Sequence, residues 1–403
     1  MTDVAIVGAG ASGLMAAILI KRHNPKLNIS LIERLDRVGK KLSTTGNGRC
    51  NISNLDLKAE HFHSNDKKFA IGILENFSLA PTREFFLSLG IIFKEGEKGK
   101  LYPYSLQANA VVDALRFEVE RLGITLHLNE QITSIKKSGD IFTLKTAENT
   151  YKSRAVLIAS GGMAGGKIAT DSGYMLLKSL GHKITDLSPA IVQLKCDSEH
   201  LRALKGNKCD AQVTLKRGGK AVKSDFGELL FCDYGLSGPP VLAVSREAKK
   251  GDVISLDIMP DMELAEIVEL LKKRQSLSPT LTLSNYFCGL IRSRIGQAVI
   301  KMCGLNINEP ISSAKGQEEK LAHIIKNMEF SVIGHNGFAN AQVTCGGAST
   351  HEFDEKTLMS KKVSGLFSSG EVLDVDGDCG GYNLQWAWSS AKTASDGILE
   401  YLR

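Results

Sequence analysis

The 403-residue sequence lacks several features that would place it in other classes of protein. No apolar run approaches the roughly 20 residues that span a bilayer, so we expect a soluble protein with no membrane partner. The first strand begins almost at the N-terminus, which leaves no place for a signal peptide. The eight cysteines are scattered without a C-x-x-C pair, which favours a reducing cytoplasm.

Catalytic and metal-binding patterns are also missing. The sequence shows no Ser-His-Asp set and no Walker loop, and its nine histidines have no liganding spacing, so we expect no metal. Charge is nearly balanced, with 50 Lys and Arg against 44 Asp and Glu and a net charge of +6. This mild excess can steer anionic partners such as nucleic acid, although a solvated surface explains it as well. The chemistry therefore has to come from a cofactor.

A glycine fingerprint near the N-terminus predicts where that cofactor binds. Residues 4–7 form a short apolar run typical of a buried parallel strand, and Gly8, Gly10 and Gly13 follow it in the pattern G-x-G-x-x-G. The glycines permit a sharp turn, close approach of a phosphate, and close packing of the next helix on the sheet. A second strand ends in Glu33, twenty residues past Gly13, where a carboxylate accepts ribose hydroxyls. The pattern predicts binding of FAD or NAD.

A polar loop at residues 34–54 follows the second strand. It has no apolar periodicity and is rich in glycine, hydroxyl, amide and cationic side chains, which is typical of a loop that binds a polar ligand. Its segment 39–51 reads G-K-K-L-S-T-T-G-N-G-R-C-N. This segment closely resembles the signature of the BaiN/RdsA family of NAD(P)/FAD-dependent oxidoreductases. In that family the loop runs beside the pyrophosphate and ribityl chain of FAD toward the flavin ring.

Three further segments carry the same resemblance. The turn at 159–162 is similar to the A-T-G-G turn that returns the chain to the FAD domain. Residues 231–240 resemble F-T-x-x-G-L-S-G-P-x, with Cys232 in the place of threonine and Ser237 as the expected cap of a helix. Residues 365–377 resemble G-L-Y-F-A-G-E-x-L-D-V-D-G. The glycine pair that follows starts the last helix, whose free amides are expected to face the flavin N1 and C2 carbonyl.

These patterns predict an α/β fold, with a Rossmann-like FAD-binding domain of the glutathione-reductase type that carries an inserted small β-barrel and a helical subdomain. We expect the FAD-binding domain at 1–185 plus 335–403. Short β-like runs separated by turns place the inserted antiparallel β domain at 186–260. Apolar stripes at helical spacing over 264–275, 283–303 and 318–328 predict three helices and place the helical subdomain at 261–334. An RNA-binding role would need the cations of this subdomain to form one continuous basic face, and a solvated helical surface is the default expectation.

The fingerprint and the resemblance together give the expected site. The residues expected to bind FAD are Gly8, Gly10, Ala11, Ser12, Gly13, Glu33, Arg34, Lys40, Lys41, Gly46, Gly48, Arg49, Asn51, Ile132, Ala159, Gly161, Gly370, Glu371, Asp374, Gly381, Asn383 and Leu384. Arg49, Cys50 and Asn47 are the candidate catalytic residues, because the loop that holds them is expected to reach the flavin ring. Each is also interpretable as a cofactor-binding or packing residue, and Cys345 is a further candidate. Tyr382, Trp386 and Trp388 are expected in the core.

The resemblance implies an enzyme that passes electrons from transiently bound NAD(P)H through FAD to an organic acceptor. We expect the reduction of an activated C=C bond in a small molecule by hydride from flavin N5. Three alternatives stay open: dihydrouridine synthesis with ribosomal RNA as the partner, an oxygen-using oxidase of a small amine, and a flavin-binding protein without enzymatic activity. The sequence carries no signal for an oligomeric state.

Overall fold

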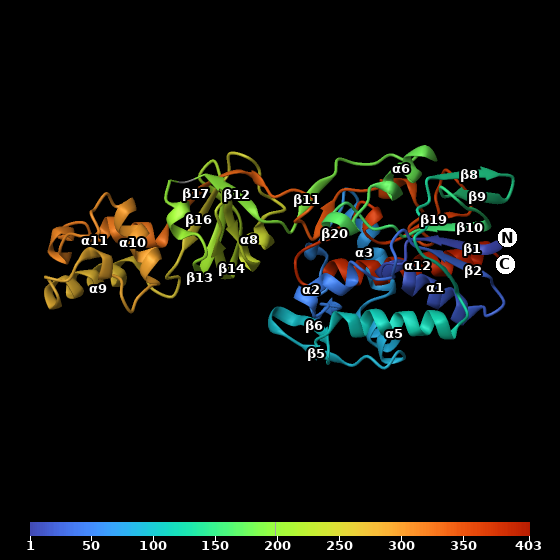
Figure 1. Ribbon diagram of the computed structural model, residues 1–403, viewed down its shortest axis with the longest axis horizontal. Coiled ribbons are helices and arrows are strands. Elements are labelled where there is room, and N and C mark those ends of the chain that lie inside the picture. Colours follow the sequence, from blue (N-terminus) through green and yellow to red (C-terminus); the bar gives the residue numbers. More distant parts are fainter. Residues whose placement is uncertain (198) are drawn as a thin grey trace. The chain divides into compact units, whose positions relative to one another are not determined.

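The computed structural model describes residues 1–197 and 199–403 and divides the chain into two compact units (Figure 1). The first unit comprises residues 1–189 and 341–403, and the second comprises residues 190–340. Both chain ends lie in the first unit. The sequence predicted that the FAD-binding domain is interrupted between residues 185 and 335, and the structure places this interruption between residues 189 and 341. Within the described ranges, no helix has the length and apolar character needed to cross a membrane.

The first unit is built on a seven-stranded sheet with the order β7-β2-β1-β10-β9-β8, and β19 also pairs with β10. Its strands are β1 (Thr2–Val7), β2 (Ile29–Ile32), β7 (Thr125–His127), β8 (Ser134–Ser138), β9 (Ile141–Lys145), β10 (Thr150–Ile158) and β19 (Leu366–Ser368). β1 pairs in parallel with β2 and β10, whereas β8, β9 and β10 form an antiparallel meander. The central strand β1 carries the buried apolar run Val4–Val7, as expected for a parallel strand that helices cover on both faces of the sheet. This is the expected Rossmann-like fold.

Helices α1 (Ala11–His23), α3 (Lys67–Asn76), α5 (Ala108–Arg121) and α12 (Tyr382–Tyr401) pack around this sheet (Figure 1). α12 is buried along nearly its whole length, and its many Ala and Ser side chains allow α1 to approach it closely. The two tryptophans of α12 are fully buried, as expected from the sequence. Trp386 Nε1 donates to the Gly370 carbonyl at 3.0 Å, and Trp388 Nε1 donates to the Ile52 carbonyl at 2.9 Å.

Smaller elements complete the first unit. The short strands are β3 (Ser53–Asn54), β4 (Phe62–His63), β5 (Phe93–Glu95), β6 (Lys100–Pro103), β11 (Ser188–Ala190), β18 (Val343–Cys345) and β20 (Asp376–Gly377). The short α-helices are α2 (Thr45–Gly48), α4 (Leu79–Leu87) and α6 (Ser172–Ser179). Single 3-10 turns lie at Leu42–Thr44, Ala59–His61, Glu97–Gly99, Gly166–Ile168, Thr350–Glu352 and Gly370–Val372.

The second unit contains a closed barrel with the strand order β12-β15-β14-β13-β16-β17. Its strands are β12 (Leu194–Asp197), β13 (Lys208–Arg217), β14 (Lys220–Phe231), β15 (Gly235–Ser237), β16 (Val253–Asp257) and β17 (Met328–His335). Its helices are α7 (Leu201–Leu204), α8 (Pro239–Val244), α9 (Leu264–Leu277), α10 (Ser293–Met302) and α11 (Glu318–Lys326), with 3-10 turns at Leu283–Asn285 and Ile311–Ala314. Barrel and helices share one apolar core, whereas the sequence suggested separate domains at 186–260 and 261–334.

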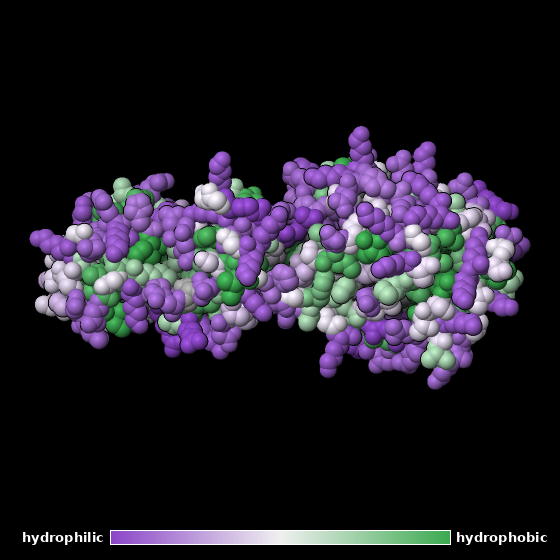
Figure 2. All heavy atoms as spheres, turned by 90° about the horizontal axis from the view of Figure 1, so that it is seen from above, coloured by the Kyte–Doolittle hydropathy of each residue, from purple (hydrophilic) through white to green (hydrophobic). Residues whose placement is uncertain are grey.

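Two local expectations for the second unit were wrong. A single helix was expected over 283–303, but α10 begins only at Ser293, after a turn in which Gly289 has a left-handed φ of 83°. Ser237 was expected to cap the helix that starts at the prolines. Instead it is the last residue of β15, and Gly238, with a φ of 103°, occupies the N-cap position of α8. Figure 2 shows hydrophilic side chains over most of the visible face of both units.

Candidate functional site

The glycine fingerprint forms an open cradle between β1 and α1. A Cβ on Gly8 would lie 2.5 Å from the Ala159 carbonyl oxygen, and a Cβ on Gly13 would lie 1.9 Å from the Gly8 carbonyl oxygen. These two glycines are required by the packing of the protein itself. A Cβ on Gly10 would meet no atom within 4 Å. The space beside Gly10 is therefore open at the amino end of α1, where free amides and the helix dipole attract an anion such as pyrophosphate.

Glu33 stands at the carboxyl end of β2, beside this cradle. Its Oε2 accepts a hydrogen bond from Ala9 N at 2.8 Å, and its Oε1 accepts one from Leu35 N at 2.9 Å. The two amides fix the carboxylate, and each oxygen keeps a lone pair that can accept a ribose hydroxyl. The neighbouring Arg34 donates to the carbonyls of Ile168 and Ala169 at 3.0 and 3.2 Å, so its guanidinium is already held by the protein backbone.

Four residues near the end of the signature loop have left-handed backbone conformations. The φ angles are 58° at Gly46, 55° at Asn47, 80° at Gly48 and 57° at Cys50. For Asn47 and Cys50 this conformation carries a strain of roughly 1 kcal/mol or more, which proteins retain mainly at functional sites. A Cβ on Gly46 would lie 2.9 Å from Asn51 N, whereas one on Gly48 would meet no atom within 4 Å. The loop therefore exposes backbone at Gly48, as a ligand-binding turn does.

The candidate catalytic residues of this loop have different environments. Arg49 and Asn47 are exposed. The Arg49 guanidinium lies over the ring of Tyr102, 5.1 Å from its centroid, and Nε donates to the Gly46 carbonyl at 3.3 Å. Cys50 is fully buried in the apolar core, and this burial raises the pKa of its thiol to about 12. Arg49 therefore presents a fixed positive charge, whereas Cys50 is a neutral packing group in this structure.

A second polar cluster forms around Glu371, at the end of β19. Its Oε2 pairs with Lys41 Nζ at 2.6 Å, and its Oε1 accepts a hydrogen bond from Thr344 N at 2.8 Å. A Cβ on Gly162 would lie 2.5 Å from Thr344 Oγ1 and 2.6 Å from Glu371 Oε1, so only glycine fits there. The structure thus gathers segments that are up to 330 positions apart in the sequence. Lys40, by contrast, pairs with Asp36 on its own loop.

Gly370 joins this cluster to the cradle. Its φ is 77°, and an added Cβ would lie 2.7 Å from Ser12 Oγ. Gly370 N donates to Ser390 Oγ at 2.9 Å. The hydroxyls of Ser368 and Ser369, immediately before it, are buried and have no hydrogen-bond partner in the described part of the protein. Buried hydroxyls without a protein partner mark a place that a polar ligand or an ordered water can satisfy.

The start of α12 has the glycine pair noted in the sequence. Gly381 has a φ of 100°, and an added Cβ would lie 2.4 Å from the Ser53 carbonyl oxygen. Gly381 is therefore required by contact with β3, and a Cβ on Gly380 would lie 2.8 Å from the ring of Tyr382, reasons that the sequence did not reveal. The Asn383 side chain accepts from Gly377 N at 2.8 Å and donates to its carbonyl at 2.7 Å, which fixes the turn before the helix. Leu384 is half-buried in the next position.

Most of the remaining residues that were expected to bind FAD are buried in the core or hydrogen-bonded to other parts of the protein. Ile132 and Ala159 are buried in the core of the first unit. Asp374 is buried, and its Oδ2 accepts a hydrogen bond from Asn65 Nδ2 at 2.6 Å. Gly161 has a φ of 70° and open space on its Cα, so it can face a ligand. The other expected residues are Ala11 and Ser12, in the first turn of α1, and Asn51, whose Oδ1 accepts from Leu101 N at 3.1 Å.

The structure also builds a Ser-His-acid chain, which the sequence analysis missed. His182 lies 2.9 Å from Ser360 Oγ through Nε2 and 3.0 Å from Glu352 Oε2 through Nδ1. The His182 side chain is fully buried, and Ser360 Oγ also accepts from Lys362 N and Val363 N. A substrate cannot reach this hydroxyl, so the chain is structural. Burial lowers the pKa of His182.

The fold and these features define a Rossmann-fold flavoprotein oxidoreductase as the class of this protein. Residues 2–397 match the family model described as "HI0933-like protein Rossmann domain", and the chain belongs to that family. The resemblance to the BaiN/RdsA flavoproteins is thereby confirmed.

Two curated relatives and one solved structure illustrate what the chain is similar to. It is 34% identical to the 3-dehydro-bile acid delta(4,6)-reductase of Clostridium scindens, over 99% of this chain and 100% of that protein. It is 30% identical to the ribosomal RNA dihydrouridine synthase of Haemophilus influenzae, over 96% of each. The 3-ketosteroid delta1-dehydrogenase of Sterolibacterium denitrificans has 12% identity and a TM-score of 0.51 over 99% of both chains, and therefore shares the fold.

Proposed function

We propose that this protein is an FAD-dependent reductase that uses NAD(P)H to reduce an activated C=C bond in a small organic molecule. The observation that carries the proposal is the cradle at Gly10. A Cβ on Gly10 would meet no protein atom, whereas a Cβ on Gly8 or Gly13 would collide with the protein backbone. The carboxylate of Glu33, fixed by two backbone amides, flanks this open space. A phosphate site next to a ribose acceptor is what a dinucleotide requires. The polar cluster around Glu371 lengthens the site beyond the ribose.

The residues present fit FAD. The amides at the start of α1 would hold the pyrophosphate, and Glu33 would accept the hydroxyls of the adenosine ribose. Lys41 and Thr344 orient Glu371, which would accept a hydroxyl of the ribityl chain. The first amides of α12 would place the positive end of that helix toward the ring. When bound, FAD supplies two-electron redox chemistry at its N5 atom.

Among the candidate catalytic residues, we assign the main role to Arg49. Tyr102 and the Gly46 carbonyl hold its guanidinium in an exposed position on the signature loop. A fixed positive charge stabilises the negative charge that develops on the oxygen of an enone during reduction. Asn47 offers a neutral amide donor from the same loop. Cys50 would keep the loop in place through its buried side chain rather than donate a proton.

The relatives support C=C reduction as the reaction. One is named as a reductase of a bile acid and the other as a dihydrouridine synthase, and both names describe addition of hydrogen across a C=C bond. The second candidate function is therefore dihydrouridine synthesis in ribosomal RNA, favoured by the 30% identity over 96% of both chains. None of the eight cysteines forms a disulfide in the described part of the protein, which suits a reducing compartment, and we propose the cytoplasm.

An anaerobic titration of the purified holoprotein tests the proposal. We expect NADH or NADPH to bleach the visible flavin band, and a conjugated 3-keto steroid to restore it without oxygen. Restoration by protein-free ribosomal RNA alone, with a matching gain of dihydrouridine, would select the second candidate. Bleaching by an amine followed by peroxide release in air would establish an oxidase. A protein without bound flavin, or with flavin that no donor reduces, would contradict the proposal.

A further inference from the structure

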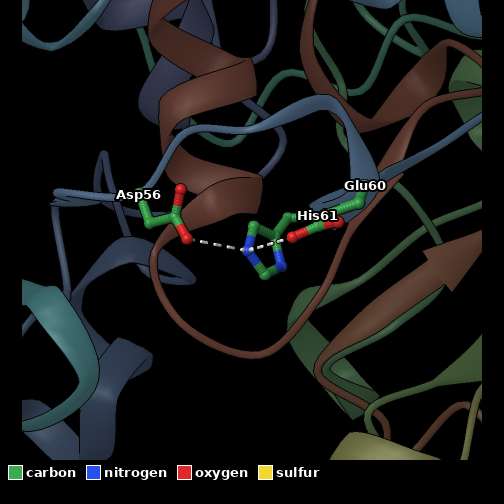
Figure 3. Close-up of side chains that lie close together, drawn as sticks. All are labelled: Asp56, Glu60 and His61. Carbon is green, nitrogen blue, oxygen red and sulfur yellow. Dashed lines mark ion pairs between the residues drawn. The ribbon is translucent and has the colours of Figure 1, made fainter.

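A histidine and two carboxylates converge in the first unit, outside the cradle. His61 Nε2 lies 3.5 Å from Asp56 Oδ2 and 3.9 Å from Glu60 Oε1, and these three atoms all lie within 4.8 Å of one another (Figure 3). The sequence predicts no metal site, because its histidines lack liganding spacing. Here the 3-10 turn at Ala59–His61 brings the donors together instead.

The imidazole of His61 is oriented from its other side. Its Nδ1 lies 3.2 Å from Asp378 Oδ2, while Asp378 Oδ1 lies 3.0 Å from His63 Nε2. Asp378 N also donates to the His61 carbonyl at 2.9 Å. The ring stacks on Tyr382 with 4.4 Å between centroids. A carboxylate on Nδ1 directs the lone pair of Nε2 toward Asp56 and Glu60, which is the usual outer-shell arrangement of a metal-bound histidine.

We propose that Asp56, Glu60 and His61 bind a divalent transition-metal ion, with Zn²⁺ as the best match and water in the fourth position. Zinc accepts one imidazole and two carboxylates, and two ligands at about 2.1 Å in a tetrahedron lie about 3.4 Å apart. The pair of His61 and Asp56 is already at that separation. Glu60 is exposed and needs only a small side-chain movement to complete the set.

Lys58 competes for the same site. Its Nζ lies 3.1 Å from Asp56 Oδ2, the oxygen that also faces His61. Both side chains of this pair are largely exposed, so the pair is weak and an ion can displace it. The ion would then connect the segment 56–61, through His61 and Asp378, to the turn that precedes α12. Removing the competing ammonium should strengthen metal binding, whereas removing a ligand should weaken it.

Calorimetric titration of the purified holoprotein with Zn²⁺ tests the site. We expect one ion per chain, with binding at least about 10-fold weaker in Asp56→Asn and in Glu60→Gln, because each variant removes one ligand charge. Asp378→Asn should cost about 10- to 100-fold through the orientation of His61. Lys58→Met should tighten binding several-fold. The control Glu95→Gln, at an exposed acid on β5, should bind like the wild type.

Cysteine thiols elsewhere in the chain also attract zinc. The variants distinguish zinc bound by Asp56, Glu60 and His61 from zinc bound by these thiols. Wild-type protein that binds no Zn²⁺ would overturn the proposal. Binding that persists unchanged in both Asp56→Asn and Glu60→Gln would overturn it as well, because the ion would then lie elsewhere. Circular dichroism and flavin content of each variant show that a loss of binding is not a loss of folding. Zinc binding is measured without any electron donor or acceptor, so its result does not depend on whether the proposed reductase activity is correct.

Discussion

The two units differ in how they use polar side chains in their interiors. In the first unit, Gln385 on α12 accepts from Ser53 Oγ at 2.6 Å and donates to Thr82 Oγ1 at 2.9 Å and Ser389 Oγ at 3.0 Å. Many further buried Ser, Thr, Asn and Asp side chains lie in this unit. Among the described residues of the second unit, the buried polar side chains are Ser245, Asp252, Ser255 and Glu318. The rest of its core is almost entirely apolar.

This difference follows from what each unit has to hold in place. A barrel and helices that bury apolar faces need only complementary packing. The first unit fixes glycine-rich turns in strained conformations around an open, polar site, and its buried hydrogen bonds fix those turns. The comparison predicts that substitutions which disturb the closely packed turns of the first unit affect both stability and flavin binding, whereas a substitution that only fills the open space of the cradle affects flavin binding. Substitutions in the second unit should affect stability alone.

The largest effect is expected for Gly13→Ala. The new Cβ would lie 1.9 Å from the Gly8 carbonyl oxygen, so α1 has to move away from the turn after β1. We expect more than about 4 kcal/mol of destabilisation and complete loss of flavin. The matched control is Gly235→Ala in the barrel, where a Cβ would lie 2.1 Å from the Leu194 carbonyl oxygen. The comparison fails if Gly235→Ala also releases the flavin from folded protein.

Truncating a core side chain of the second unit should lower the free energy of unfolding of that unit by about 3–5 kcal/mol. The stability of the first unit should not change. Phe330 is buried, and its ring lies 6.0 Å from that of Phe231. Both tryptophans of the sequence, Trp386 and Trp388, belong to the first unit. We therefore expect Phe330→Ala to shift a transition seen by circular dichroism, while the tryptophan-fluorescence transition and the flavin content stay at wild-type values. A fluorescence transition that shifts equally would show that the units unfold together.

The pH dependence of the first unit offers a smaller test. Burial lowers the pKa of His182 in the folded protein, so the unfolded chain binds a proton more readily. The stability that depends on neutral His182 is therefore fully present above the ordinary pKa of histidine, and it is lost as the pH falls from there through the lower pKa of the folded protein. We expect His182→Gln to flatten the decline in unfolding free energy between about pH 7 and pH 5.

The sequence predicted those parts of the fold that depend on local pattern. The fingerprint at Gly8, Gly10 and Gly13, the parallel strands and the existence of an inserted β-rich segment all follow from periodicity and turn residues. The shared core of the barrel and helices was missed, because pattern alone does not show which apolar faces meet. The turn before Ser293, where a continuous helix was expected, was missed for a local reason, since one glycine in an apolar stripe does not by itself reveal a turn.

Contacts between distant segments were predicted less completely than the fold. Ser360, His182 and Glu352 are separated by up to 178 positions, so no spacing in the sequence connects them. The same holds for Thr344 beside Glu371 and for Tyr102 beneath Arg49. Cys50 shows the opposite error, since its place in a specific motif suggested chemistry, while the structure buries it. Motifs indicate which segments meet at a ligand, but the direction of each side chain depends on the tertiary packing.

The smallest effect on stability, and the sharpest test of the cradle, is expected for Gly10→Ala. Gly10 has a φ of −84° and a ψ of −163°, which alanine adopts readily, and its Cβ would meet no protein atom within 4 Å. The flavin-free protein should therefore stay within about 1 kcal/mol of the wild-type unfolding free energy. Because that Cβ enters the space proposed for the pyrophosphate, flavin affinity should fall by at least about 10-fold, measured by equilibrium titration of the flavin-free protein. Wild-type flavin affinity in this variant would place the pyrophosphate elsewhere, and Gly10 would then differ from Gly8 and Gly13 for a reason unrelated to a ligand.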